Sequence, residues 1–279
     1  MPEGRRSIII SIFSTSSGNG KTMTAINLAA SLANEGYAVC LVDLDLQFGD
    51  VTNYLKLEPI HTIIDAQIAM ERGSSDFDIM DYLTEFSHVD ENGKRLEFFV
   101  LARPPMIFDA YGIAVPVVER IINSLKWFNF VVIDLNAAFS ALNLAVLDTS
   151  TIINYLGVVD FLPSVKNFKL GYDTLIRFEY EESKIRLVEN RADSQKLING
   201  RDVERLIGEK FFHRLPNDFR AVTKSIQDGM PLMFSSPNSA LSKSFLEIAA
   251  KYTNKQKEDK PGDSNSQGFI SKIWNKFFG

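Results

Sequence analysis

The chain has 279 residues, of which 45% are hydrophobic and 23% charged, a globular composition that excludes a disordered chain or a fibre. Its formal net charge of −5 disfavours a globally basic nucleic-acid binder, so no nucleic-acid partner is expected. The single cysteine, Cys40, excludes an internal disulfide and fits a reducing compartment, and no apolar run approaches the roughly 18 residues of a membrane span.

Short apolar runs alternate with helical stretches along the chain. Buried strands are predicted over residues 8–13, 38–43, 96–101, 130–134, 152–159, 185–189 and 211–215. Helices are predicted over residues 21–35, 117–125 and 241–252, and others between the remaining strands. Continuous apolar strands that alternate with helices favour an α/β fold, with a mostly parallel twisted sheet and helices on both faces.

The composition changes after residue 252, which predicts three parts. Residues 1–252 form the α/β domain. Residues 253–267 carry no apolar side chain except Pro261 and are predicted to be a polar, flexible linker. Residues 268–279 are a short apolar segment that is not expected to join the main core.

The first predicted strand runs into a loop of small residues, and Lys21 and Thr22 open the helix that follows. Backbone N–H groups of such a loop can cradle phosphates, while the Lys21 ammonium reaches the β and γ phosphates and the Thr22 hydroxyl ligates Mg²⁺. The common pattern has a glycine six residues before the lysine, where this chain has Thr15, and a loop that simply begins a helix is the alternative. The residues expected to bind a nucleotide here are Ser17, Gly18, Asn19, Gly20, Lys21, Thr22 and Met23.

Acidic residues end two of the predicted strands. Carboxylates at the C-terminal edge of a parallel sheet lie where ligands bind in open α/β folds. Asp45, just after the second strand, is placed to orient a water toward a γ-phosphate or to hold Mg²⁺ through water. Asp134 ends an apolar strand and could hold a water of the same ion, so the candidate metal residues are Thr22, Asp45 and Asp134. The alternative is that these acids are solvated loop residues.

The segment SSGNGKT, residues 16–22, resembles the deviant phosphate loop of the MinD/ParA ATPases, whose pattern is KGGxGKT. Glycines 18 and 20, Lys21 and Thr22 match this pattern, whereas Ser16 stands where the signature lysine of the family would be. The resemblance implies binding of ATP with Mg²⁺ and an ATP-dependent homodimer. In the family that lysine reaches the phosphates of the partner subunit, and a serine supplies no such charge, so we expect weak hydrolysis.

The segment DLDLQFGDV, residues 43–51, resembles the switch region of the CpaE/TadZ branch, the pilus-assembly relatives of MinD. The resemblance covers roughly residues 5–252 and is weakest over residues 60–125. By this resemblance Lys21 and Asp45 are the candidate catalytic residues. Further resemblance, after two later strands, places the base-binding loop at Asn190, Arg191, Pro216 and Asn217, with the asparagine of the Asn-Arg pair reading adenine.

The resemblance makes the leading hypothesis an ATPase that localises or assembles a membrane-associated machine, with pilus or secretion proteins as partners. A MinD-like role in division-site or flagellar placement is the alternative, and a nucleotide-binding scaffold with little hydrolysis is another. DNA partition is disfavoured by the net charge of −5. A tyrosine kinase of polysaccharide export is disfavoured because no tyrosine follows Tyr252.

The last twelve residues carry a separate signal. At about 100° per residue, their large apolar side chains occupy one half of a helix, and Ser271, Lys272, Asn275 and Lys276 occupy the other half. This segment resembles the C-terminal membrane-targeting helix of MinD and implies attachment of a cytoplasmic protein to the inner, anionic face of the cell membrane. A helix docked on the protein's own core or in a partner groove is the alternative. The predicted membrane residues are Phe269, Ile270, Ile273, Trp274, Phe277 and Phe278.

Overall fold

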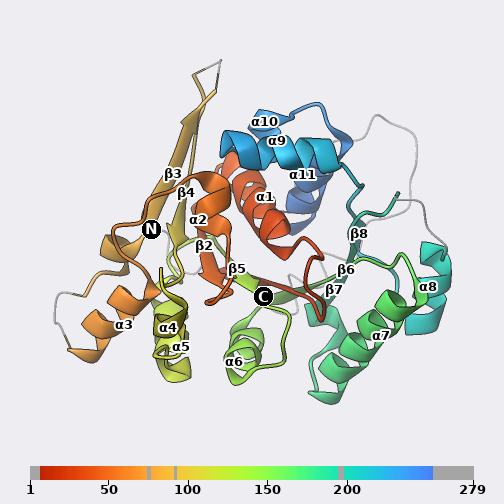
Figure 1. The fold of residues 1–279 in the computed structure, drawn as a ribbon, viewed down its shortest axis with the longest axis horizontal. Helices are drawn as coiled ribbons and strands as arrows, with labels where there is room; N and C mark the ends of the chain where they lie inside the picture. The colour runs from red at the N-terminus through yellow and green to blue at the C-terminus, as the bar shows by residue number, and fades with distance from the viewer. Residues whose placement is uncertain (1–6, 74–76, 91–92, 194–197, 254–279) are drawn as a thin grey trace.

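The computed structural model describes residues 7–73, 77–90, 93–193 and 198–253. At its centre is an eight-stranded sheet with the strand order β3-β4-β2-β5-β1-β6-β7-β8 (Figure 1). All neighbouring strands pair in parallel except β3 and β4, which are antiparallel. The strands are β1 (Ile8–Phe13), β2 (Val39–Leu44), β3 (Thr84–Val89), β4 (Arg95–Leu101), β5 (Phe130–Leu135), β6 (Ile152–Gly157), β7 (Ile185–Glu189) and β8 (His213–Arg214).

Helices cover both faces of the sheet (Figure 1). One layer holds α1 (Lys21–Asn34), α2 (Val51–Leu55), α9 (Phe219–Asp228), α10 (Leu232–Ser235) and α11 (Ala240–Thr253). The other holds α3 (Ile63–Glu71), α4 (Ile107–Ala110), α5 (Val115–Ser124), α6 (Ala141–Thr149), α7 (Leu162–Arg177) and α8 (Gly200–Ile207). Two short 3₁₀ helices, η1 (Ile79–Tyr82) and η2 (Glu182–Lys184), precede β3 and β7. Each layer closes its own hydrophobic core, because the central strands are buried on both faces.

The register of the central strands brings three loops to one edge of the sheet. Asp134 on β5 pairs with Ile12 on β1 and with Asp43 on β2. Parallel strands in register end at the same edge, so the loops after β1, β2 and β5 emerge side by side. The predicted α/β fold is therefore confirmed.

Most predicted strands are confirmed, with two corrections. The run 211–215 forms only a two-residue strand, His213–Arg214, because it pairs with β7 alone at the edge of the sheet and Pro216 soon follows. The antiparallel strand β3 was not predicted, because only Phe86 among its six residues is buried and no continuous apolar run marks it. The predicted linker and the C-terminal amphipathic segment lie outside the described residues. Within the described ranges, no helix is long and apolar enough to cross a membrane.

A buried histidine joins β8 to α11. The Nε2 atom of His213 lies 2.8 Å from Ser244 Oγ and 3.0 Å from the Ser244 carbonyl oxygen. On the other side of the ring, Lys251 Nζ lies 3.1 Å from Nδ1. A lysine ammonium can only donate, so Nδ1 must be unprotonated and the ring neutral. Burial, with a smaller contribution from Lys251, lowers the pKa of His213 from 6.5 to about 4.

This histidine predicts a pH dependence of stability. The folded state holds the ring neutral, so as the pH falls the unfolded chain takes up the proton first. Stability from this group is fully present above pH 6.5 and is lost progressively as the pH falls toward 4, by about 2 kcal/mol at pH 5. Urea unfolding at pH 7 and pH 5 measures the loss. We expect His213→Gln to reduce it and His61→Gln, at an exposed position, to leave it unchanged. Equal pH dependence in the wild type and His213→Gln would contradict this assignment.

Candidate functional site

The phosphate loop, residues 14–20, connects β1 to α1 at the edge where the three loops emerge. Gly18 and Gly20 have φ angles of +73° and +85°, in the left-handed region that favours glycine. Gly20 also lies so close to the Asn190 amide that a Cβ atom would overlap it. Lys21 begins α1 and is 8% exposed, so the loop leads directly into a helix N-terminus that starts with a shielded lysine.

The Ser14 hydroxyl organises the loop from within. It accepts hydrogen bonds from the Ser16 N–H (3.2 Å) and the Asn19 side-chain amide (2.7 Å), and it donates to the Ser16 carbonyl oxygen (3.0 Å). These hydrogen bonds order residues 14–19 of the loop, and none of them involves a glycine. Ser16 thus has a structural place in the loop but brings no positive charge to it.

Thr22 and Asp134 form the candidate magnesium site. The Thr22 hydroxyl donates to Asp134 Oδ2 at 2.6 Å. Asp134 Oδ1 is buried and has no hydrogen-bond partner among the described residues. Burial raises the pKa of Asp134 to about 7, although the Thr22 hydrogen bond and the Lys21 charge act in the opposite direction. An orphaned carboxylate oxygen beside a hydroxyl suits Mg²⁺ held through water, so the residues present fit this ion.

The described residues contain no cluster of three His, Cys, Asp or Glu side chains that could hold a metal by themselves. This does not disagree with a magnesium site, because Mg²⁺ in nucleotide sites is held by one or two carboxylates together with phosphates and water. Thr22, Asp134 and a nucleotide would supply such a ligand set.

The loop after β2 is built around Asp43. This carboxylate is fully buried and accepts from the backbone N–H groups of Asp45 (3.2 Å) and Val51 (3.4 Å). Burial, followed by the neighbouring Asp134 carboxylate, raises the pKa of Asp43 well above its usual value. Gly49 packs directly against the carboxylate, where a Cβ atom would overlap both oxygens. Asp43 therefore shapes the loop, while the predicted site residue Asp45 is half-buried and its carboxylate accepts a hydrogen bond from the Phe48 N–H at 3.3 Å.

The predicted base-binding residues meet the phosphate loop. Asn190, after β7, donates from its side-chain amide to the Asn19 carbonyl oxygen at 2.8 Å, and Arg191 donates to the Gly18 carbonyl oxygen at 3.2 Å. Arg191 has a φ angle of +54°, which is uncommon for a residue with a side chain.

The remaining predicted residues have less direct contacts. Asn217, after β8, donates its backbone N–H to Asp193, and Pro216 lies next to it at the end of the adjacent strand. Ser17 is exposed, and Met23 is half-buried against the core on the α1 side. The structure thus brings Asn190 and Arg191 to the phosphate loop, whereas Met23 packs partly buried against the core.

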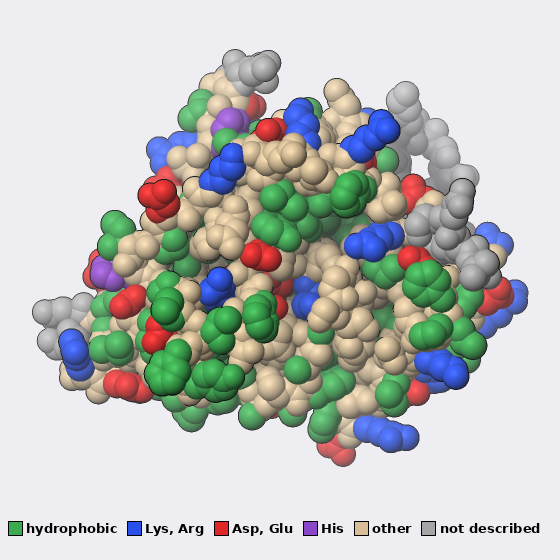
Figure 2. Space-filling view, viewed as in Figure 1, with side chains coloured by type: hydrophobic (Ala, Val, Ile, Leu, Met, Phe, Trp, Pro, Cys, Tyr) green, Lys and Arg blue, Asp and Glu red, His purple; other side chains and the backbone are tan. Residues whose placement is uncertain are grey.

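Arg103 was missed by the sequence interpretation. Its Nε atom donates to the Gly49 carbonyl oxygen at 2.6 Å, and its charge opposes the raised pKa of Asp43. Arg103 comes just after β4, so a charged residue that follows a buried strand was the available signal. Large apolar side chains are exposed in the loop after β2 and on and beside α4, and Figure 2 shows hydrophobic side chains gathered around α4. They are Phe48, Met106, Ile107, Phe108 and Tyr111.

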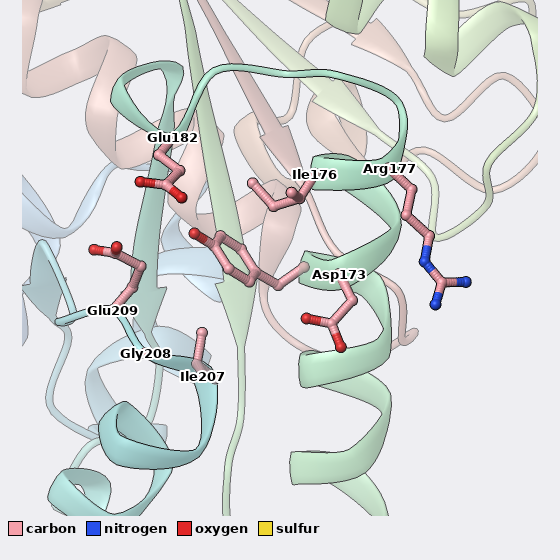
Figure 3. Close-up of a pocket in the computed structure, with 8 residues that line it drawn as sticks. Asp173, Ile176, Arg177, Glu182, Ile207, Gly208 and Glu209 are labelled. Atoms are coloured by element: carbon pink, nitrogen blue, oxygen red, sulfur yellow. The ribbon is translucent and has the colours of Figure 1, made fainter.

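A separate cavity of about 430 Å³ lies at the C-terminal end of α7. It is lined by Tyr172, Asp173, Ile176, Arg177, Glu182, Ile207, Gly208 and Glu209. Figure 3 shows Glu182 and Glu209 on one side of it, Asp173 and Ile176 on the other, and Arg177 pointing away. None of these residues follows the C-terminal end of a strand, so this cavity is distinct from the phosphate-loop site.

The chain matches the family model described as "CobQ/CobB/MinD/ParA nucleotide binding domain" over residues 10–232. A ParA family ATPase from Chlorobium tepidum superposes with a TM-score of 0.76 and 22% identity, covering 88% of this chain and 98% of that one. The septum site-determining protein MinD from Pyrococcus horikoshii, complexed with Mg-ADP, gives 0.72 and 19%, covering 88% and 96%. MinD of the MinC:MinD complex from Aquifex aeolicus gives 0.67 and 18%, covering 92% and 99%. No curated protein matches the chain.

The contact between Gly49 and Asp43 predicts a specific sensitivity. We expect Gly49→Ala to lower the free energy of unfolding by about 1–3 kcal/mol, because the added methyl group overlaps a buried carboxylate that cannot move away. Urea denaturation measures the effect. Gly112→Ala is the matched control, since its nearest atom is 3.3 Å from the added Cβ and a small change is expected. Similar stability of the two variants would show that the loop yields easily.

Proposed function

We propose that this chain, which belongs to the CobQ/CobB/MinD/ParA nucleotide-binding domain family, is an ATP-binding ATPase that localises or assembles a membrane-associated machine. The observation that best supports a nucleotide-binding site is the glycine-containing loop that leads into α1. Lys21 is shielded at the start of this helix, and the Thr22 hydroxyl is hydrogen-bonded to Asp134. This arrangement presents backbone N–H groups, an ammonium and a magnesium site at one place.

Each polar residue of the site has a task in this proposal. Backbone N–H groups of the phosphate loop and the Lys21 ammonium bind the β and γ phosphates. Thr22 and Asp134 would hold Mg²⁺, and the ion would supply positive charge to neutralise the phosphates. Asp45 orients the attacking water from the loop that Asp43 and Gly49 shape. Asn190 and Arg191 border the base side of the loop.

Hydrolysis is expected to be slow. Ser16 cannot provide a cation to the phosphates of a partner subunit, and such a cation is worth about 10³–10⁵ in rate in related phosphoryl-transfer sites. Nucleotide binding does not depend on that charge. In this proposal ATP therefore acts mainly to favour a homodimer, and hydrolysis resets it slowly.

The branch of the family is the finer part of the proposal. The sequence DLDLQFGDV over residues 43–51 supports a CpaE/TadZ-like role with pilus or secretion proteins as partners. A MinD-like placement role is the second candidate, and it is supported by the fold shared with MinD proteins and by the C-terminal segment.

Membrane attachment would come from the amphipathic segment 268–279. Lys272 and Lys276 each add roughly 1 kcal/mol of attraction to anionic lipid, and the apolar half of the helix inserts. One short helix binds weakly, so two copies in a dimer would be needed for firm attachment. Membrane residence would then follow the ATP-dependent dimer.

The nucleotide site is tested by Lys21→Ala. We expect Mg-ATP affinity to fall by about 100-fold or more, because the phosphates lose the ammonium of the loop. Isothermal titration calorimetry measures the affinity. Lys126→Ala, an exposed lysine shortly before β5 and hence at the opposite edge of the sheet, is the control and should bind like the wild type. Unchanged affinity in a folded Lys21→Ala variant would exclude the phosphate-loop assignment.

The membrane proposal is tested by removing residues 268–279. We expect the shortened protein to keep Mg-ATP affinity and to lose sedimentation with anionic liposomes, because the apolar half-helix is gone. Ile273→Gln should weaken sedimentation strongly, whereas Ser271→Gln on the polar half should not. If the full chain ignores liposomes and the shortened one loses thermal stability, the segment is instead a docked helix.

A further inference from the structure

The beginning of the phosphate loop is tied to the neighbouring strand and helix. Thr15 occupies the position where the common pattern has glycine. Its Oγ1 atom lies 2.9 Å from the Tyr155 hydroxyl on β6 and 3.2 Å from the Asn167 carbonyl oxygen on α7. The Tyr155 hydroxyl in turn donates to the Phe168 carbonyl oxygen at 2.9 Å. A glycine at position 15 could make none of these side-chain contacts.

The two hydroxyl groups form one connected unit. The two hydroxyls make three contacts: one with each other, one with the Asn167 carbonyl oxygen and one with the Phe168 carbonyl oxygen. Only two protons are available for these three contacts. If Tyr155 donates to Phe168, Thr15 donates either to Tyr155 or to Asn167. Removing either hydroxyl therefore disturbs the bonding of the other, and their effects should not be additive.

Tyr155 is a rigid anchor. Its side chain is fully buried, and its ring stacks on that of Phe168 with centroids 4.6 Å apart and planes 7° apart. The Phe168 ring packs directly over Gly157, where a Cβ atom would overlap it. This packing holds the Tyr155 ring, and with it the hydroxyl, against α7.

Gly171 explains how the helix can come this close. Glycine in the middle of a helix lowers its stability relative to alanine, so its presence in α7 calls for a reason. A Cβ atom at position 171 would overlap both the Tyr155 hydroxyl oxygen and Thr15 Cγ2. Because Gly171 has no side chain, α7 can approach the two hydroxyls closely.

We propose that Tyr155 is a positioning residue that acts through Thr15 to hold the phosphate loop in its binding conformation before the nucleotide arrives. This inference rests on the proposed nucleotide site. A loop that is already ordered loses less conformational entropy on binding, so the tether strengthens affinity without touching the ligand. In the common pattern a glycine at this position allows the loop conformation. Here the contact between Thr15 and Tyr155 would hold that conformation instead.

The test is a double-mutant cycle with near-isosteric variants, Tyr155→Phe and Thr15→Val. Each should weaken Mg-ATP binding by about five- to tenfold in calorimetric titration, and the double variant should be little worse than either one. Tyr180→Phe is the matched control, because it removes another buried hydroxyl, bonded to Asp148 at 2.6 Å, with no connection to the loop. It should lose stability but keep its affinity. Additive effects, or equal losses of affinity in Tyr180→Phe, would overturn the inference.

A second measurement needs no nucleotide. Hydrogen exchange of the loop amides at residues 16–20 should be faster in Tyr155→Phe than in the wild type and unchanged in Tyr180→Phe. Unchanged exchange in Tyr155→Phe overturns the tether, whatever the wild type binds. If the wild type does not bind Mg-ATP while exchange responds as expected, the proposed nucleotide function fails and the tether itself stands.

Discussion

Pairing of β5 with β1 on one side and β2 on the other fixes the place of Asp134, and the site is arranged around that place. One carboxylate oxygen of Asp134 accepts a hydrogen bond from the Thr22 hydroxyl at the start of α1. The other oxygen is buried and has no hydrogen-bond partner among the described residues. A second buried carboxylate, Asp43, is its register neighbour. Two ionised acids so close together in a shielded position are costly unless a proton or a cation neutralises them, and the raised pKa values of both residues reflect this. The sheet therefore holds a local electrostatic imbalance at the edge where Lys21 and the phosphate loop also lie.

Sequence patterns predicted the parts of the fold that depend on one stretch of residues. The runs 8–13 and 185–189 became β1 and β7 without change, because buried parallel strands are apolar throughout. The antiparallel β3 escaped notice, because one of its faces is polar and its pairing with β4 is decided by tertiary contacts. A short edge strand such as β8 similarly depends on its neighbour more than on its own residues.

The same distinction holds within the site. Lys21, Thr22 and Asp134 could be identified because each stands at a fixed offset from a strand or helix end. Tyr155 could not, because its role arises from a contact with Thr15, which is distant in the sequence. Arg103 stands just after β4, but its partner Gly49 is also distant, so its position alone did not indicate its contact. Asp43 shows a third case: the sequence placed it at the sheet edge, but only the close approach of Gly49 separates its loop-shaping role from that of Asp45.

The close packing around Gly171 limits which substitutions this sequence can accept during evolution. Thr15, Tyr155 and Gly171 occupy one small volume although they belong to a loop, a strand and a helix. No one of them can be exchanged for a larger residue without loss, so substitutions at the three positions should be inherited as a set. Homologues that have glycine at the first position would be free to carry other residues at the second and alanine at the third. Their alignment would record the contact as covariation.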